Sequence, residues 1–127
     1  MRVALDTNRY TDLMRGDAAT THAVETAEAV FLPLFVLGEL RAGFALGRHG
    51  AANEGALRQF LLRPGVEILY PDQQTTLQYA AIYRQLRGQG TPIPTNDMWV
   101  AALVLQHDLC LLDRDRHFDA LPQITRM

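Results

Sequence analysis

Four acidic residues stand at places in the chain where their side chains could hold a metal ion. Asp6 directly follows an apolar run, Glu39 lies in a helical pattern, Asp97 falls in the first turn of an apolar helix, and Asp115 follows a second apolar run. Carboxylates gathered in one cleft raise one another's pKa unless cations neutralise them. Without Cys or clustered His, such oxygens favour Mg²⁺ or Mn²⁺ over Zn²⁺, and these ions support hydrolysis of phosphodiester bonds by metal-activated water.

Glu39 is the most informative of the four carboxylates. On a helical wheel it falls about 40° from Phe35, between Leu46 and Gly43, and therefore on an apolar stripe. Arg41 lies about 160° away around the wheel and cannot neutralise it. A buried carboxylate needs compensation, so we expect a cation near Glu39. An Arg from another element, or a neutral Glu39, remains the alternative.

Each of the other three carboxylates also has a local explanation. Asp6 fits the cap of the helix that follows it. The charge of Asp97 would complement the dipole at the amino end of its helix. Asp115 would form a turn in the polar stretch 113–119. The hypothesis of a metal centre therefore depends on whether the four side chains meet.

Strand-like and helical patterns alternate along the chain. Four β-competent runs predict strands at Arg2–Leu5, Val30–Leu34, Val66–Tyr70 and Leu109–Leu112. Helices are predicted at Arg9–Arg15, Asp17–Ala29, Phe35–Leu46, Ala51–Leu62, Asp72–Arg87 and, with Thr95 as its cap, Met98–Leu105. This alternation predicts an α/β fold around a mostly parallel sheet, in which ligands bind beyond the carboxyl ends of the strands. The last helix is apolar on nearly every side and should lie buried between layers.

The composition predicts one soluble globular domain over residues 1–127. The chain is 48% hydrophobic with a net charge of −2, and a chain of this size needs no disulfide to hold a core. All 12 basic residues are Arg. The lack of Lys excludes P-loop and Schiff-base chemistry. It also disfavours a haloacid-dehalogenase-type phosphatase, which further requires an acid where Asn8 stands.

We expect a cytoplasmic protein without a membrane segment. Arg2 and Asp6 interrupt any signal core, and no apolar run approaches 18 residues. The single Cys110 fits a reduced, buried thiol. The near-neutral charge balance argues against a broadly basic nucleic-acid coat, so any contact with RNA should be local.

Four short motifs carry a resemblance to a known family. They are Leu5–Asn8, Gly38–Leu40, Asn96–Asp97 with Val100–Ala102, and Leu111–Leu112 with Arg114, Asp115 and Phe118. In this order they resemble the PIN-domain nucleases, specifically the VapC-type ribonuclease toxins of bacterial toxin–antitoxin pairs, over essentially the whole chain. The resemblance implies a three-layer α/β/α sandwich with four to five strands, and a Mg²⁺- or Mn²⁺-dependent endoribonuclease acting on tRNA or rRNA. It also implies a homodimer inhibited by a cognate antitoxin.

The resemblance also implies roles for individual residues. Asp6, Glu39, Asp97 and Asp115 are expected to be the metal-binding and catalytic residues. Asn8 and Asn96 are expected to orient them through hydrogen bonds.

Asp113 departs from the family pattern, which usually has Thr or Ser at this position. It is expected either to strengthen metal binding or to face solvent beside Arg114 and Arg116. These two residues and Arg9 are candidate contacts to RNA phosphates, with ordinary surface charge as the alternative. His117 is likewise either a contact to RNA or an ordinary surface residue. Trp99 is expected in the core or a dimer interface.

A second hypothesis uses the same carboxylates without catalysis. A PIN-like binding module would dock an Arg-bearing partner peptide, or RNA, at the acidic pocket. Uptake of Mn²⁺ distinguishes the two, because the nuclease requires it.

Overall fold

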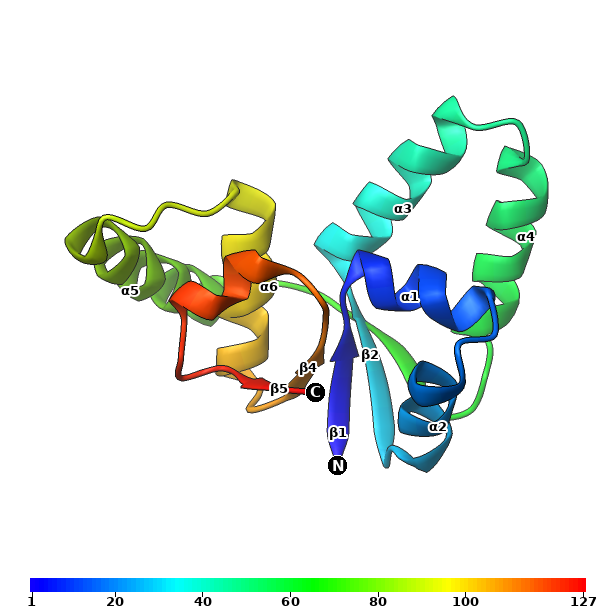
Figure 1. Cartoon of the computed structure of the whole chain (residues 1–127), viewed down its shortest axis with the longest axis horizontal. Helices are drawn as coiled ribbons and strands as arrows, with labels where there is room; N and C mark the ends of the chain where they lie inside the picture. Colours follow the sequence, from blue (N-terminus) through cyan, green and yellow to red (C-terminus); the bar gives the residue numbers. More distant parts are fainter.

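Five short parallel strands form one sheet at the centre of the computed structural model, which describes residues 1–127 (Figure 1). The strands are β1 (Arg2–Leu5), β2 (Ala29–Pro33), β3 (Val66–Leu69), β4 (Cys110–Leu112) and β5 (Thr125–Arg126). Their order across the sheet is β3-β2-β1-β4-β5. The strand that is first in the chain is therefore in the middle of the sheet.

Six α-helices and one 3₁₀ helix flank the sheet. They are α1 (Thr7–Met14), α2 (Ala18–Thr26), α3 (Leu34–Leu46), α4 (Gly50–Leu61), α5 (Gln73–Gln89), α6 (Thr95–Gln106) and the 3₁₀ helix η1 (Arg116–Ala120). In Figure 1, α5 and α6 lie to the left of the strands and α1 to α4 lie to the right. This arrangement confirms the predicted α/β sandwich. None of the helices combines the length and apolar character needed to cross a membrane.

The pairing of β1 with β4 sets the edge at which the predicted site should form. Val3 is in register with Cys110, and Leu5 with Leu112. One residue further, the backbone N–H of Asp6 donates a hydrogen bond of 3.0 Å to the carbonyl of Leu112. The ends of these two strands are thus side by side, although more than a hundred residues separate them in the chain.

Helix α6 is the most deeply buried helix, as its all-round apolar pattern predicts. Its residues 100–104 have no more than 1% of their surface exposed. They belong to a core of 29 residues that also includes the inward side chains of β1 and β4. Asp97, in the first turn of α6, is therefore fixed by a rigid helix.

Several predicted boundaries are wrong by a few residues. Helix α2 ends at Thr26 rather than Ala29, because β2 already begins at Ala29. Helix α5 continues to Gln89 and ends where Gly90 takes a left-handed conformation with φ of 69°. Thr95 does not cap α6: it is the first helical residue, and Pro94 occupies the cap position without a side-chain hydrogen bond.

Two elements near the end of the chain have no counterpart in the sequence prediction. The stretch 113–119, interpreted as a turn, contains most of η1. Strand β5 has only two residues, too few for an alternating pattern. It pairs with β4, with Thr125 opposite Cys110 and Arg126 opposite Leu111.

Candidate metal centre

The four predicted acidic residues come from different elements and meet at the carboxyl edge of the sheet. Asp6 follows β1, Glu39 lies in the second turn of α3, Asp97 lies in the first turn of α6, and Asp115 precedes η1. The negative charges of the last three all act on the carboxyl group of Asp6. Oxygens of Asp97 and Asp115 also lie within 4.8 Å of each other and of a nitrogen of His117.

Asp6 is the most deeply buried of the four, at 4% exposure. It occupies the cap position of α1, yet its carboxylate makes no capping hydrogen bond, so the local explanation for this residue is wrong. Burial, together with the charges of Asp97 and Glu39, raises the pKa of Asp6 from its ordinary 3.8 to about 7, and the N–H of Thr7 offsets part of this rise. An ionised Asp6 therefore calls for a cation nearby.

Asp97 and Asp115 share one imidazole. His117 Nδ1 lies 2.7 Å from Asp97 Oδ2 and 3.1 Å from Asp115 Oδ1. The hydrogen bond to Asp97 raises the pKa of His117. Burial raises the pKa of Asp97 and outweighs the opposing effect of this hydrogen bond. His117 therefore links the two carboxylates, and its contact to Asp97 joins residues that lie 20 positions apart in the chain.

Glu39 is held by two neutral donors. Thr7 Oγ1 donates to Glu39 Oε2 at 2.9 Å, and Asn96 Nδ2 donates to Glu39 Oε1 at 3.1 Å. The residue is half-buried rather than enclosed in the apolar face of the helix. The alternative of an Arg from another element is wrong, because Glu39 forms no ion pair with an arginine. The two hydrogen bonds fix the direction of both carboxylate oxygens while leaving the residue partly open to solvent.

The two predicted orienting amides have different outcomes. Asn96 contacts Glu39 as expected. Asn8 makes no side-chain hydrogen bond to the acidic residues, and Thr7, its neighbour, occupies that role. Thr7 was missed as an orienting residue, although its place directly after Asp6 gave a signal: the first turn of α1 begins there.

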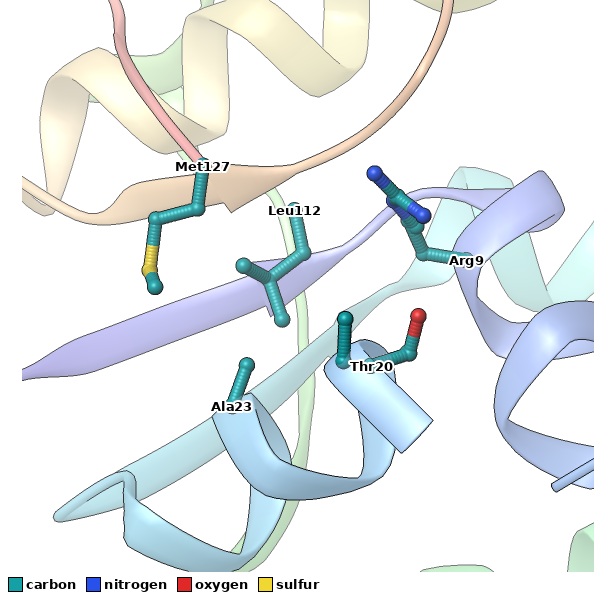
Figure 2. Close-up of a pocket in the computed structure, with 6 residues that line it drawn as sticks. Arg9, Thr20, Ala23, Leu112 and Met127 are labelled. Carbon is teal, nitrogen blue, oxygen red and sulfur yellow. The ribbon is translucent and has the colours of Figure 1, made fainter. Parts of the chain in front are cut away.

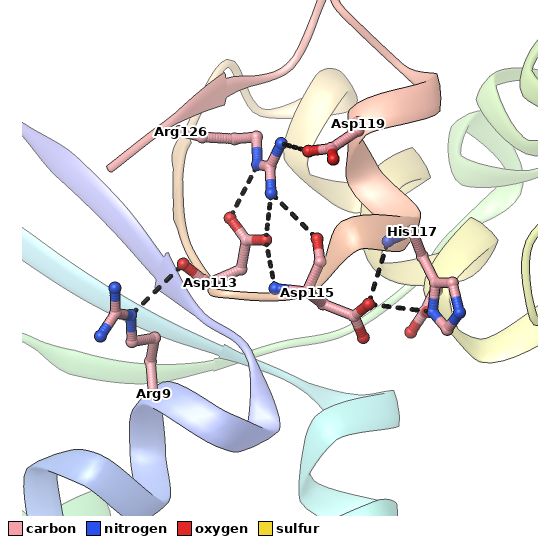
Figure 3. Close-up of polar contacts among 7 residues, drawn as sticks. Arg9, Asp113, Asp115, His117, Asp119 and Arg126 are labelled. Atoms are coloured by element: carbon pink, nitrogen blue, oxygen red, sulfur yellow. Dashed lines mark hydrogen bonds and ion pairs between the residues drawn. The ribbon is translucent and has the colours of Figure 1, made fainter.

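Asp113 is paired with an arginine, and the expectation that it faces solvent is wrong. It is buried, at 4% exposure, and both its oxygens are bound by Arg126, at 2.9 and 2.8 Å. One of these oxygens also accepts the backbone N–H of Asp115 at 3.0 Å. Figure 3 shows this carboxylate directed at Arg126. We therefore leave Asp113 out of the candidate ligands.

The three candidate arginines differ in how available they are to a ligand. Arg114 forms two hydrogen bonds to Asp12, and Arg9 contacts the same carboxylate at 3.4 Å and the carbonyl of Asp113 at 3.3 Å. Arg9 also lies at the edge of a mostly apolar cavity of about 140 Å³ between α2 and β4 (Figure 2). Arg116 is exposed and makes no ion pair, so it is the arginine most available to a ligand.

The aromatic residue beside the site is packed. Trp99 stacks on Phe35, with ring centroids 5.6 Å apart, and on Tyr79, at 4.0 Å. Its neighbour Met98 is buried. Both findings agree with a packing role for these two residues.

The residues present fit a hard divalent cation. Their donor atoms are mainly carboxylate oxygens, which Mg²⁺ and Mn²⁺ prefer. One ion with bonds of about 2.1 Å spans opposite ligands about 4.2 Å apart, and carboxylate oxygens of Asp97 and Asp115 lie within 4.8 Å of each other. Burial is the main cause of the raised pKa of Asp6, and the charges of Asp97, Glu39 and Asp115 add to it, so a bound cation would favour the ionised form of this carboxyl group.

The chain is similar in sequence to a known protein family and to two ribonucleases. The family model described as PIN domain matches residues 3–124. Ribonuclease VapC4 of Mycobacterium tuberculosis is 30% identical over 88 residues, which cover 69% of this chain and 68% of that protein. Ribonuclease VapC1 of Haemophilus influenzae is 37% identical over 68 residues, about half of each chain.

A solved structure shares the fold over the full length. The structure of VapBC2 from Rickettsia felis, bound to a DNA fragment from their promoter, superposes with a TM-score of 0.87. The match covers 100% of this chain and 98% of the other at 20% identity. It therefore supports the arrangement of strands and helices that positions the acidic residues.

Proposed function

This chain belongs to the PIN-domain family and is of the VapC ribonuclease type, and from this premise we propose that it is the toxin of a toxin–antitoxin pair and hydrolyses RNA phosphodiester bonds with a bound Mg²⁺ or Mn²⁺. The observation that carries the proposal is the buried Asp6 facing three further carboxylates from α3, α6 and the segment before η1. Such a concentration of negative charge is costly to the fold and useful for holding a cation. A cytoplasmic location follows from the RNA substrate.

The proposed ligands are Asp6, Glu39, Asp97 and Asp115. A bound divalent cation supplies a more acidic water molecule and charge that offsets the phosphate oxygens. The protein's part is to fix the carboxylates before substrate arrives. Thr7 and Asn96 orient Glu39, helix α6 holds Asp97, and the start of η1 holds Asp115.

The reaction we propose is attack of water on phosphorus. A bond forms between the water oxygen and phosphorus while the bond from phosphorus to the 3′-oxygen breaks, and the leaving oxygen takes up a proton. The products carry a 5′-phosphate and a 3′-hydroxyl. Arg116, exposed next to Asp115, is placed to contact a phosphate of the RNA, and Arg9 and Arg114 would have to leave Asp12 to do so.

We propose a cognate antitoxin and a second copy of the chain as protein partners. The antitoxin would insert a cationic side chain among the carboxylates and displace the metal. The homodimer is supported by exposed apolar side chains on α5, where Leu77 and Tyr83 are 63% and 47% exposed. tRNA or rRNA is the proposed substrate class.

The experiment that tests the function replaces Glu39 by Gln. The Gln side chain keeps one oxygen that can accept a hydrogen bond from Thr7 or Asn96, but it lacks the negative charge of Glu39. We expect calorimetric titration to give a Mn²⁺ affinity at least about tenfold below that of the wild-type chain, and cleavage of a tRNA and rRNA mixture to fall with it. The matched control is Glu25→Gln on α2, an exposed glutamate without a side-chain partner. A wild-type chain that takes up no Mn²⁺ would favour the noncatalytic binding module.

A further inference from the structure

One arginine of β5 contacts the segment that carries Asp115 at four points. Arg126 Nε and Nη2 donate to the two oxygens of Asp113, at 2.9 and 2.8 Å. Nη2 also donates to the backbone carbonyl of Asp115 at 2.9 Å, and Nη1 donates to Asp119 at 2.6 Å. Figure 3 shows the guanidinium at the centre of these contacts.

The backbone of Asp115 is held on both sides. Its N–H donates to Asp113 Oδ2 at 3.0 Å, and its carbonyl accepts from Arg126. The same Nη2 atom reaches both Asp113 Oδ2 and the Asp115 carbonyl. Residues 113–115 belong to neither β4 nor η1, so no regular hydrogen-bond ladder fixes them. The Asp115 carboxylate accepts the backbone N–H of His117 at 3.0 Å, while this pair holds the peptide groups on both sides of the Asp115 Cα.

We propose that Arg126, acting through Asp113, is a positioning residue for the metal ligand Asp115. The inference rests on the function proposed above. The pair fixes the peptide groups on either side of the Asp115 Cα, so that its carboxylate stays beside Asp97. Arg126 also neutralises Asp113, whose side chain is 1% exposed, and keeps a fifth negative charge from adding to those of the site.

The geometry favours Arg at this position over any other cation. A planar guanidinium donates in several fixed directions at once, whereas a Lys ammonium is a point charge. Here the directions serve two carboxylates and one carbonyl. Charge alone would hold Asp113; it would not also fix the Asp115 carbonyl.

The test separates positioning from general stability by using two variants. Arg126→Lys keeps the positive charge opposite Asp113 but loses the planar guanidinium that donates in several directions at once. The double variant Asp113→Leu, Arg126→Leu leaves no unpaired buried charge, and such replacements are often neutral for folding. Because ligand-orienting residues affect metal affinity by about 10- to 100-fold, we expect both variants to bind Mn²⁺ at least about tenfold more weakly in calorimetry. Hydrogen exchange should show faster exchange of the Asp115 amide in the double variant.

The matched control is Arg41→Gln. Arg41 binds Glu54 through two hydrogen bonds of 2.9 and 3.0 Å between α3 and α4, away from the site. It should lower stability slightly and leave Mn²⁺ affinity unchanged within about twofold. If the Arg126 variants bind Mn²⁺ as the wild-type chain does while Glu39→Gln does not, the inference is wrong and the proposed function stands. If the wild-type chain binds no Mn²⁺, both are wrong.

Discussion

Replacing Asp6 by Asn should stabilise the metal-free protein at alkaline pH. The pKa of Asp6 is about 7 in the folded chain, against 3.8 ordinarily, because the residue is buried and faces other carboxylates. Between these values the folded state holds a proton that the unfolded chain has released, so stability is highest at low pH and falls as the pH rises. At about 1.36 kcal/mol per pKa unit, the loss reaches about 4 kcal/mol by about pH 8.

The Asn variant does not ionise and escapes this loss. In urea unfolding with a chelator present, we expect both chains to have similar stability near pH 4. At about pH 8 the variant should exceed the wild-type free energy of unfolding by up to about 4 kcal/mol. The gap should open between about pH 4 and about pH 7, where the unfolded chain has released the proton that the fold retains, and level off above that range.

Metal should narrow the stability difference between the two proteins at about pH 8. Saturating Mn²⁺ at about 100 times its Kd stabilises a chain that binds it by about 2.7 kcal/mol. We expect this gain in the wild-type chain and little of it in Asp6→Asn, which should also lose RNA cleavage.

The control for this experiment is Asp17→Asn. Asp17 is also an aspartate at a helix cap, but it is exposed and accepts hydrogen bonds from Thr20 N and Oγ1 at 2.9 and 2.7 Å. Asn caps a helix about as well, and because the hydrogen bonds from Thr20 lower the pKa of Asp17, this change should not stabilise the chain as the pH rises. The reasoning is refuted if Asp6→Asn is less stable than the wild-type chain at about pH 8 without metal.

Three further outcomes follow from other contacts. Tyr10→Phe should raise the free energy of unfolding by about 1 kcal/mol in urea titration, because the buried Tyr10 hydroxyl has no hydrogen-bond partner; a loss of stability would point to an unseen partner. His117→Ala should raise Mn²⁺ affinity at about pH 6 by about threefold or more and have less effect at higher pH, because the raised pKa keeps a competing positive charge on the imidazole; weaker binding would instead make His117 a ligand. Arg116→Gln should weaken binding of RNA about threefold in a filter assay and leave Mn²⁺ binding unchanged, since the side chain is exposed and unpaired; equal RNA affinity would remove it from the interface.

The sequence predicts which edge of the sheet brings the four acidic residues together, whereas their role as metal ligands stays a prediction. Asp6 directly follows a strand and Asp97 lies in the first turn of an apolar helix, so each is fixed by a local pattern that survives in the structure. In a parallel sheet, patterns of this kind also predict which ends of the strands meet. The environment of Glu39 was predicted less well, because a helical wheel gives the face of a helix but not the donors that other elements bring to it.

Contacts between distant polar residues could not be predicted. Asp113 binds Arg126 across 13 residues, and His117 reaches Asp97 across 20, with no shared periodicity. Strand β5 is two residues long and is defined by its pairing with β4 alone. Local propensity carries no information on any of these pairings, which depend on how the loops after β4 close over the sheet.

The central place of β1 has a consequence for when the protein becomes active during translation. Its partner β4 and the later segment with Asp115 are made about a hundred residues after it, and β1 stays unpaired on that side until they emerge from the ribosome. Pairings this distant in sequence form late in folding. A nascent or prematurely terminated chain lacking this region has neither Asp115 nor the neighbour of β1. With Asp115 as one of the metal ligands proposed above, the metal site of a nascent chain is therefore incomplete until synthesis has passed this residue.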